Sequence, residues 1–147
     1  GIDSFFSSTD NNFFITGVQL EVGSVATPFE HRSYGEELAL CQRYYFVLIE
    51  GNGDRAGVGG YFSSSAIQFP IQFPIRMRAS PTLEVGSGTN FYTVNGAAND
   101  TIDDVTLDGA TSRSCSIFNN TDASGTTGDH GILGSGTNGF VKFTSEL

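Results

Sequence analysis

A group of oxygen-bearing side chains between positions 99 and 104 is the segment of the sequence closest in type to a ligand-binding site. Asn99, Asp100, Asp103 and Asp104 offer the hard oxygen atoms that Ca²⁺ binds in proteins. Their spacing departs from that of an EF-hand loop, and no glutamate follows at the required distance. We therefore expect a solvated loop, with a weak Ca²⁺ site or a site for sugar hydroxyl groups as the alternative.

The other motifs that could support chemistry are incomplete. The sequence G-x-G-x-x-G occurs at residues 134–139, but a dinucleotide site needs a helix after it, and residues 140–144 have the pattern of a strand. We therefore expect a loop there. His31 and His130 are far apart and lack the spacing of zinc ligands. The two cysteines, Cys41 and Cys115, are expected to be ordinary core residues in a reduced protein.

These observations predict no catalytic residue, no metal site and no cofactor, so the chain is not expected to be an enzyme. Glycosidase chemistry needs two suitably spaced carboxylates and little else. The sequence has 16 acidic residues but no motif that singles out a pair. A polysaccharide-cleaving enzyme is the remaining catalytic alternative.

Charge and composition limit the classes of molecule that this chain is expected to bind. The formal net charge is −9 with only seven basic residues, and such a surface repels nucleic acid and anionic membranes. No stretch approaches the roughly 20 apolar residues that span a bilayer, so membrane insertion is not expected. Thirteen Phe, five Tyr and 19 Gly favour many short strands whose aromatic side chains form the core.

Three N-terminal segments have regular patterns. Residues 12–23 alternate between the two faces of a half-buried strand. Residues 33–45 have the pattern of a helix, in which Ser33 and Glu36 form a capping box and Leu38, Cys41 and Tyr45 form an apolar stripe. We expect this stripe, including Cys41, to be buried on a sheet or against other copies. Residues 44–49 are apolar at every position and predict a strand covered on both faces.

Residues 67–77 alternate without a break between apolar residues and polar residues or proline. Pro70 and Pro74 have the same parity, so the two missing amide donors face one side. This pattern predicts an edge strand with a bend near a proline.

Further strands are expected at residues 82–85, 90–94, 105–107, 115–118 and 140–145, whereas residues 50–60 are rich in glycine and predict a loop. Short strands about ten residues apart are typical of antiparallel sandwiches. The predicted fold is mainly β, an antiparallel β-sandwich of jelly-roll type with one short N-terminal α-helix.

The segment FFITGVQLEVGSVATPFEHRSYGEELALCQRYYF (residues 13–46) resembles a segment of bacteriophage tail-fibre and related virion proteins. FPIRMRASPTLEV (residues 73–85) and FVKFTSEL (residues 140–147) are similar to a strand pair and to the closing strand of the same family. The resemblance implies a terminal strand and exit of an upstream β domain, or a swapped arm, at residues 1–32. A linker helix at residues 33–46 and a C-terminal sandwich tip domain at residues 47–147 would follow. It also implies that the chain is a fragment, a cleaved product or a short reading frame that lacks its upstream domain.

The family implies a homotrimeric fibre tip that is assembled in the host cytoplasm and resides in the virion. Its expected partners are copies of itself, upstream fibre or other virion proteins, and a host surface polysaccharide or receptor. The resemblance places binding in variable loops, so no individual site residue is transferred. A structural trimerisation cap, connector or decoration protein is the second hypothesis, and a tailspike-type polysaccharide-cleaving enzyme is the third.

From the residues themselves we nominate two loops, 95–104 and 122–131, as the contact surface. The side chains that could stack on or hydrogen-bond to a sugar there are Tyr92, Asn95, Asn99, Asp100, Asp103, Asp104, Asp122 and Asp129. The residues expected to mediate assembly are Leu38, Cys41, Tyr44, Tyr45 and Phe46.

Overall fold

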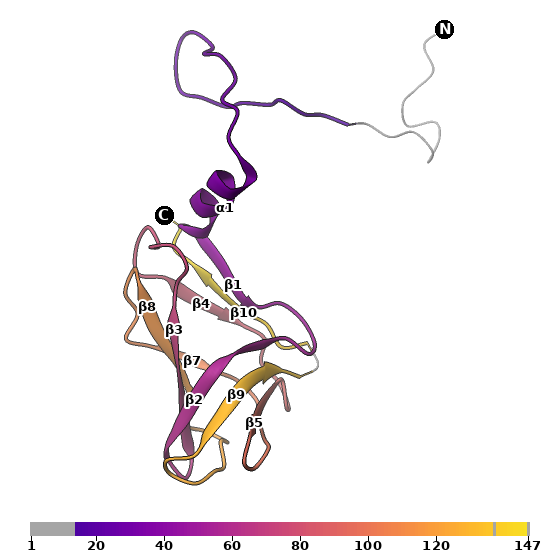
Figure 1. Ribbon diagram of the computed structural model, residues 1–147, viewed down its shortest axis with the longest axis vertical. Helices are drawn as coiled ribbons and strands as arrows, with labels where there is room; N and C mark the ends of the chain where they lie inside the picture. Colours follow the sequence, from indigo (N-terminus) through magenta and orange to yellow (C-terminus); the bar gives the residue numbers. More distant parts are fainter. Residues whose placement is uncertain (1–13, 137, 147) are drawn as a thin grey trace, which may run out of the picture. The chain divides into compact units, whose positions relative to one another are not determined.

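The structure is a computed structural model that describes residues 14–136 and 138–146 (Figure 1). The chain divides into two units, Gly1–Ser33 and Tyr34–Leu147. The second unit contains the helix and every strand of the described residues, and we call it the β domain.

In the first unit, residues 14–33 contain no helix or strand, so the strand predicted at residues 12–23 is wrong over its described part. Instead, the Glu21 carboxylate accepts hydrogen bonds from the amide and hydroxyl of Thr27, at 2.6 Å each, and Gln19 Oε1 accepts from the Glu30 amide. The alternating side chains are exposed. The alternation gives no strand because residues 14–33, the described part of this unit, contain no other strand with which they could pair.

The predicted helix is present as α1 (Tyr34–Gln42), with Glu36 and Glu37 in its first turn. It ends three residues earlier than predicted because Tyr45 already belongs to the first strand. No residue of α1 is buried, and Cys41 is exposed. The expected burial of Cys41 is therefore wrong for the single chain, whereas Cys115 is a core residue as predicted.

Two antiparallel sheets form the β domain, and the mainly β, sandwich-like fold with one short helix is confirmed (Figure 1). The smaller sheet has the order β1 (Tyr45–Ile49), β10 (Val141–Thr144), β4 (Thr82–Val85). The larger sheet is curled and has the order β6 (Asp100–Ile102), β5 (Tyr92–Gly96), β9 (His130–Ser135), β2 (Arg55–Ser63), β3 (Ala66–Gln72), β8 (Ser114–Asn119), β7 (Thr106–Asp108).

The core lies between the two sheets and follows the period-two alternation of the strands. Ile67, Phe69 and Ile71 of β3 are buried, while Pro70 and Gln72 between and after them are exposed. On the smaller sheet, Phe143 stacks with Phe46 at 6.2 Å between ring centroids and meets the edge of Phe73 at 5.2 Å. Strand β1, predicted to be covered on both faces, is only partly buried except at Ile49.

The predicted edge strand lies inside the larger sheet, because β3 pairs with β2 on one side and β8 on the other. The Phe73 amide donates to the Arg113 carbonyl on the β8 side. Amides alternate between the two edges of a strand, so Pro70 faces β2. Pairing between β2 and β3 extends only as far as Gln68. Pro70 therefore limits the pairing of two internal strands instead of protecting an outer edge.

Three strands lie in segments that the sequence predicts as loops. Strand β2 occupies most of the glycine-rich segment, β9 extends into the G-x-G-x-x-G segment, and β6 lies in the acidic segment. Close packing explains why two of these positions are glycine. An added Cβ at Gly59 would lie 2.3 Å from Phe69 Cδ1. At Gly131 the corresponding distance to Val94 Cγ1 is 2.4 Å. The other five predicted strands are present, with bounds shifted by no more than two residues.

Two glycines of β2 allow a matched test of this packing. We expect Gly59→Ala to lower the free energy of unfolding by about 1–3 kcal/mol, since the new methyl group would overlap Phe69 and the Gln68 carbonyl oxygen, 2.4 Å away. Gly57→Ala should change it by less than about 1 kcal/mol, because no atom lies within 4 Å of its added Cβ. Denaturant unfolding of both variants makes the measurement, and equal losses would contradict the packing described here.

Candidate functional site

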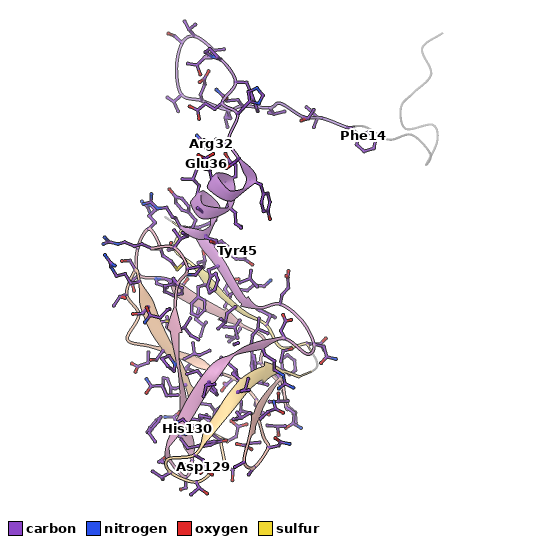
Figure 2. All side chains as sticks on the ribbon, viewed as in Figure 1. Phe14, Arg32, Glu36, Tyr45, Asp129 and His130 are labelled. Carbon is purple, nitrogen blue, oxygen red and sulfur yellow. The ribbon has the colours of Figure 1, made fainter. Side chains whose placement is uncertain are left out.

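The two nominated loops converge at one end of the β domain, which we call the loop end. The Ser124 amide donates to Asp100 Oδ2 at 2.7 Å, and the Asp103 amide donates to Asp122 Oδ2 at 2.8 Å. Figure 2 labels Asp129 and His130 at this end, opposite α1. Pairing between β5 and β9 positions the loops, because residues 95–104 and 122–131 adjoin these neighbouring strands.

The Asp100 carboxylate is engaged by the protein itself. Besides the Ser124 amide, Oδ2 accepts a hydrogen bond from the Tyr61 hydroxyl at 3.0 Å, and Oδ1 accepts from the Thr101 amide at 2.9 Å. Burial, followed by the hydrogen bond to Asp100, raises the pKa of Tyr61 above its ordinary value, so this hydroxyl stays protonated and donating. Asp100 therefore fastens strand β6 to β2 and to the loop between β8 and β9.

Asn119, which was not nominated from the sequence, occupies a similar central position. Its side-chain amide donates to Asp122 Oδ1 at 2.6 Å and to the Asp104 carbonyl oxygen at 3.0 Å. Its Oδ1 accepts from three successive backbone amides, those of residues 121–123. The side chain is buried, so it holds the loop in one conformation. A local signal that could have found it is the Asn-Asn-Thr-Asp run at residues 119–122, since Asn favours Asx turns.

The acidic residues predicted as sugar or Ca²⁺ ligands thus serve mainly as internal hydrogen-bond acceptors. Asp103 Oδ1 accepts from the Asn90 amide at 2.7 Å, and Asp104 Oδ1 accepts from Asn119. Across the described residues, no group of three or more His, Cys, Asp or Glu side chains is positioned to hold a metal ion. The Ca²⁺ alternative therefore has no geometric support in that part of the chain.

Tyr92 cannot contact a ligand, which corrects its nomination. Its side chain is fully buried, and its hydroxyl donates to the carbonyl oxygens of Gly86, at 2.8 Å, and Phe140, at 2.7 Å. Burial raises the pKa of Tyr92 to about 12. Its place on the inner face of β5 follows from the alternation that exposes Thr93 and Asn95 more than Tyr92 and Val94.

Of the other nominated side chains, Asn99 and Asp122 are exposed, and Asn95, Asp100, Asp103, Asp104 and Asp129 are half-buried. Asn95 lies opposite Ile132 of β9, which lies opposite Val58 of β2. These residues are on the outer face of the larger sheet, together with Phe62 and His130. The exposed fractions are 58% for Phe62, 56% for Val58 and 42% for Ile132. We call these five residues the outer-face patch; sequence reasoning missed most of it because β2 and β9 were predicted as loops.

The predicted assembly residues divide into two groups. Leu38, Tyr44 and Tyr45 are exposed by 42%, 43% and 41%, and Cys41 is exposed as well. Phe46 differs, because its ring packs against Phe73 and Phe143 of its own chain. Phe46 is therefore a core residue of the β domain, while the others leave an apolar surface at the α1 end.

The fold and the positions of these residues define an antiparallel, sandwich-like β domain with an apolar surface at one end and structured loops at the other.

Comparisons with protein-family models, with curated proteins and with solved structures found no match. In the described part of the chain, no helix is long and apolar enough to cross a membrane.

The hydrogen bonds of Asn119 predict a large effect of its removal. Asn119→Ala should lower the free energy of unfolding by about 2–4 kcal/mol, since it leaves buried polar groups without partners. Asn120→Ala is the matched control and should change stability by less than about 0.5 kcal/mol, because this neighbour is exposed. Thermal and denaturant unfolding measure both, and a neutral Asn119→Ala variant would refute the proposed role of this side chain.

The raised pKa of Tyr92 predicts a loss of stability in alkali. Because its folded-state pKa of about 12 exceeds the ordinary tyrosine value of 10.0, the unfolded chain releases this proton first. The contribution is complete below pH 10.0 and is lost as the pH rises toward about 12. Unfolding free energies measured across this window should therefore fall more steeply for the wild type than for Tyr92→Phe. Parallel curves for the two proteins would show that Tyr92 is not the group responsible.

Proposed function

We propose that this chain is a fibre-tip module of a virion that forms a homotrimer and attaches to saccharides of a host cell surface. The observation that supports this most directly is the separation of two surfaces at opposite ends of the β domain. Leu38, Tyr44 and Tyr45 lie at the α1 end, and the outer-face patch extends to the loop end. A module with these features would join its own copies at one end and present the other to a target.

The outer-face patch has the chemistry of a carbohydrate platform. The Phe62 ring offers an exposed apolar face on which the C–H groups of a sugar ring can stack. Asn95 and His130 supply neighbouring hydrogen-bonding groups on the same face. This patch replaces Tyr92 as the aromatic component of the contact surface in the proposal.

Hydrogen bonds within the loop end would keep this platform preformed. The Gly125 amide donates to the Ser64 carbonyl at 3.0 Å, which joins the turn after Phe62 to the loop before His130. The Gly128 amide donates to the Tyr61 carbonyl at 2.8 Å in the same region. A rigid platform loses less conformational entropy on binding, which favours weak ligands such as saccharides.

The exposed apolar α1 end also favours the second hypothesis, a structural trimerisation cap or connector. Such a protein would share the assembly surface but bind no saccharide. The enzymatic alternative is less favoured, because the carboxylates of Asp100, Asp103, Asp104 and Asp122 already accept hydrogen bonds from the protein. We therefore propose a binding module without catalytic activity.

Binding of fluorescently labelled protein to host cells, with and without their surface polysaccharide, tests the proposal. We expect binding that depends on the polysaccharide and that Phe62→Ala weakens by about tenfold, as expected for loss of a stacking ring at an interface. Phe14→Ala, which removes a ring exposed by 89% in the first unit, is the matched control and should bind like the wild type. Light scattering of the same samples reports the trimer.

The outcomes separate the hypotheses. A trimer that binds no host cells at high concentration would contradict the attachment function and favour the structural cap. A particle near the monomer mass of 15.6 kDa at micromolar concentration would contradict trimer formation. Release of reducing ends from the polysaccharide, abolished by a single Asp or Glu substitution, would contradict the proposal that the chain is not an enzyme.

A further inference from the structure

Four of the seven basic residues of this acidic chain lie in segments that the fold brings together. Arg43 follows α1, Arg76 and Arg78 follow β3, and Arg113 precedes β8. The Arg78 amide donates to the Arg43 carbonyl at 2.7 Å. The Phe73 amide donates to the Arg113 carbonyl at 3.0 Å, three residues before Arg76. We call these four residues the arginine patch.

The guanidinium groups of the arginine patch lack negative partners within the chain as described. All four residues are exposed, and none forms a salt bridge with a carboxylate of the described residues. One hydrogen bond, from Arg76 Nε to Ser112 Oγ at 3.1 Å, orients a guanidinium. Two carboxylates belong to neighbouring segments: Glu146 follows Ser145, which bonds to the Arg43 carbonyl, and Asp108 of β7 lies opposite Ser116 of β8.

The backbone around the patch is well fixed. The Met77 amide donates to the Ser112 carbonyl at 2.8 Å, and Met77 is fully buried between Arg76 and Arg78. The Ser145 hydroxyl donates to the Arg43 carbonyl at 2.8 Å. The four arginines are therefore held on a rigid surface whose local charge is opposite to the net charge of −9. Such a surface attracts anions, and arginine forms bidentate hydrogen bonds with carboxylates and phosphates.

The position of the patch along β3 indicates the form of its ligand. Strand β3 begins after the turn next to Phe62 and ends at Gln72, just before the arginines. Its seven residues, at about 3.3 Å each, separate the two patches by roughly 23 Å. Gln68, Pro70 and Gln72 line the outer face between them, and their strand partners there are Phe118, Ser116 and Ser114. This is a mostly polar track for an extended chain.

We infer that the host saccharide of the proposed function is anionic, and that the arginine patch binds its carboxylate or phosphate groups. This inference rests on the proposed function and names the class of its ligand. Sugar rings contact the outer-face patch, and an acidic group further along the chain contacts the arginines. The negative charge of the rest of the protein opposes a large acidic protein, whereas screening over roughly 8 Å allows an isolated anionic group to bind locally.

Calorimetric titration with matched saccharides tests this inference. The probes are oligogalacturonate and its fully methyl-esterified form, together with phosphorylated and unphosphorylated malto-oligosaccharide. We expect at least one charged probe to bind more tightly than its neutral partner, with an affinity that falls as salt is added. Arg76→Gln/Arg78→Gln should weaken this binding by about tenfold, and Arg78→Gln alone by less. Lys142→Gln, on β10 of the smaller sheet and outside both patches, should leave the affinity within about twofold of the wild type.

Each other result overturns the inference in an identifiable way. Equal affinities within both probe pairs, or charge-dependent binding that the double variant retains, would show that the patch is not the anion site. A change in oligomeric mass on Arg78→Gln would indicate that the arginines contact a protein instead. Binding of the wild type to host polysaccharide without charge dependence would leave the attachment function standing while the inference fails. If the protein binds neither host cells nor any probe, both the attachment function and the anionic-ligand inference are contradicted.

Discussion

The burial of Tyr92 between the two sheets is the constraint on which the rest of the β domain depends. Its ring fills the core, and its hydroxyl donates to the carbonyl oxygens of Gly86 and Phe140, which adjoin β4 and β10 of the smaller sheet. Strand β5, which contains Tyr92, belongs to the larger sheet. One side chain thus fixes the two layers relative to each other and places the β5–β6 hairpin at the loop end. An unpaired buried hydroxyl would be costly, so the two carbonyl partners make this arrangement specific.

The acidic residues follow from this placement. Because β6 pairs with β5, Asp100 lies within hydrogen-bond distance of Tyr61 and Ser124. Asp103 lies within hydrogen-bond distance of Asn90 and Asp122. Carboxylates that accept hydrogen bonds from several backbone amides and hydroxyl groups can order a loop that has few apolar contacts. Their role here is to shape the loop end. The proposed recognition therefore relies on the side chains of the outer-face patch and on the arginines beyond β3.

The sequence predicts the fold class because the alternation of Ile67, Phe69 and Ile71 is a direct consequence of strand geometry. It also predicts α1 from Ser33 and Glu36, and five strands after β3 from short runs of β-branched and aromatic residues. Strand β2 could not be predicted from its local pattern, because its central Gly59 is required by the side chain of Phe69 on the next strand. A residue whose identity is set by a tertiary neighbour gives no local signal.

The candidate site was predictable only in part for the same reason. The two nominated loops are joined by hydrogen bonds, whereas their contact with a target stays a prediction. Tyr92 was misplaced because a tyrosine can face either a ligand or the core, and only its position in β5 shows that it faces the core. Pro70 shows the opposite case. Its missing amide donor correctly predicts an interruption in strand pairing, but the sequence does not show that β2 lies on that side. The arginine patch joins three segments that lie more than 30 residues apart in the sequence, so no local spacing predicts it.

The claim that recognition uses the outer face of the larger sheet is tested most directly by mapping backbone amide shifts during titration with the host surface polysaccharide. The account predicts shifts at Phe62, His130 and Ile132, extending along β3 toward Arg76 and Arg78, with little change at Asn119. Shifts confined to the acidic loops around Asp100 and Asp122, or none on the sheet face, would contradict it.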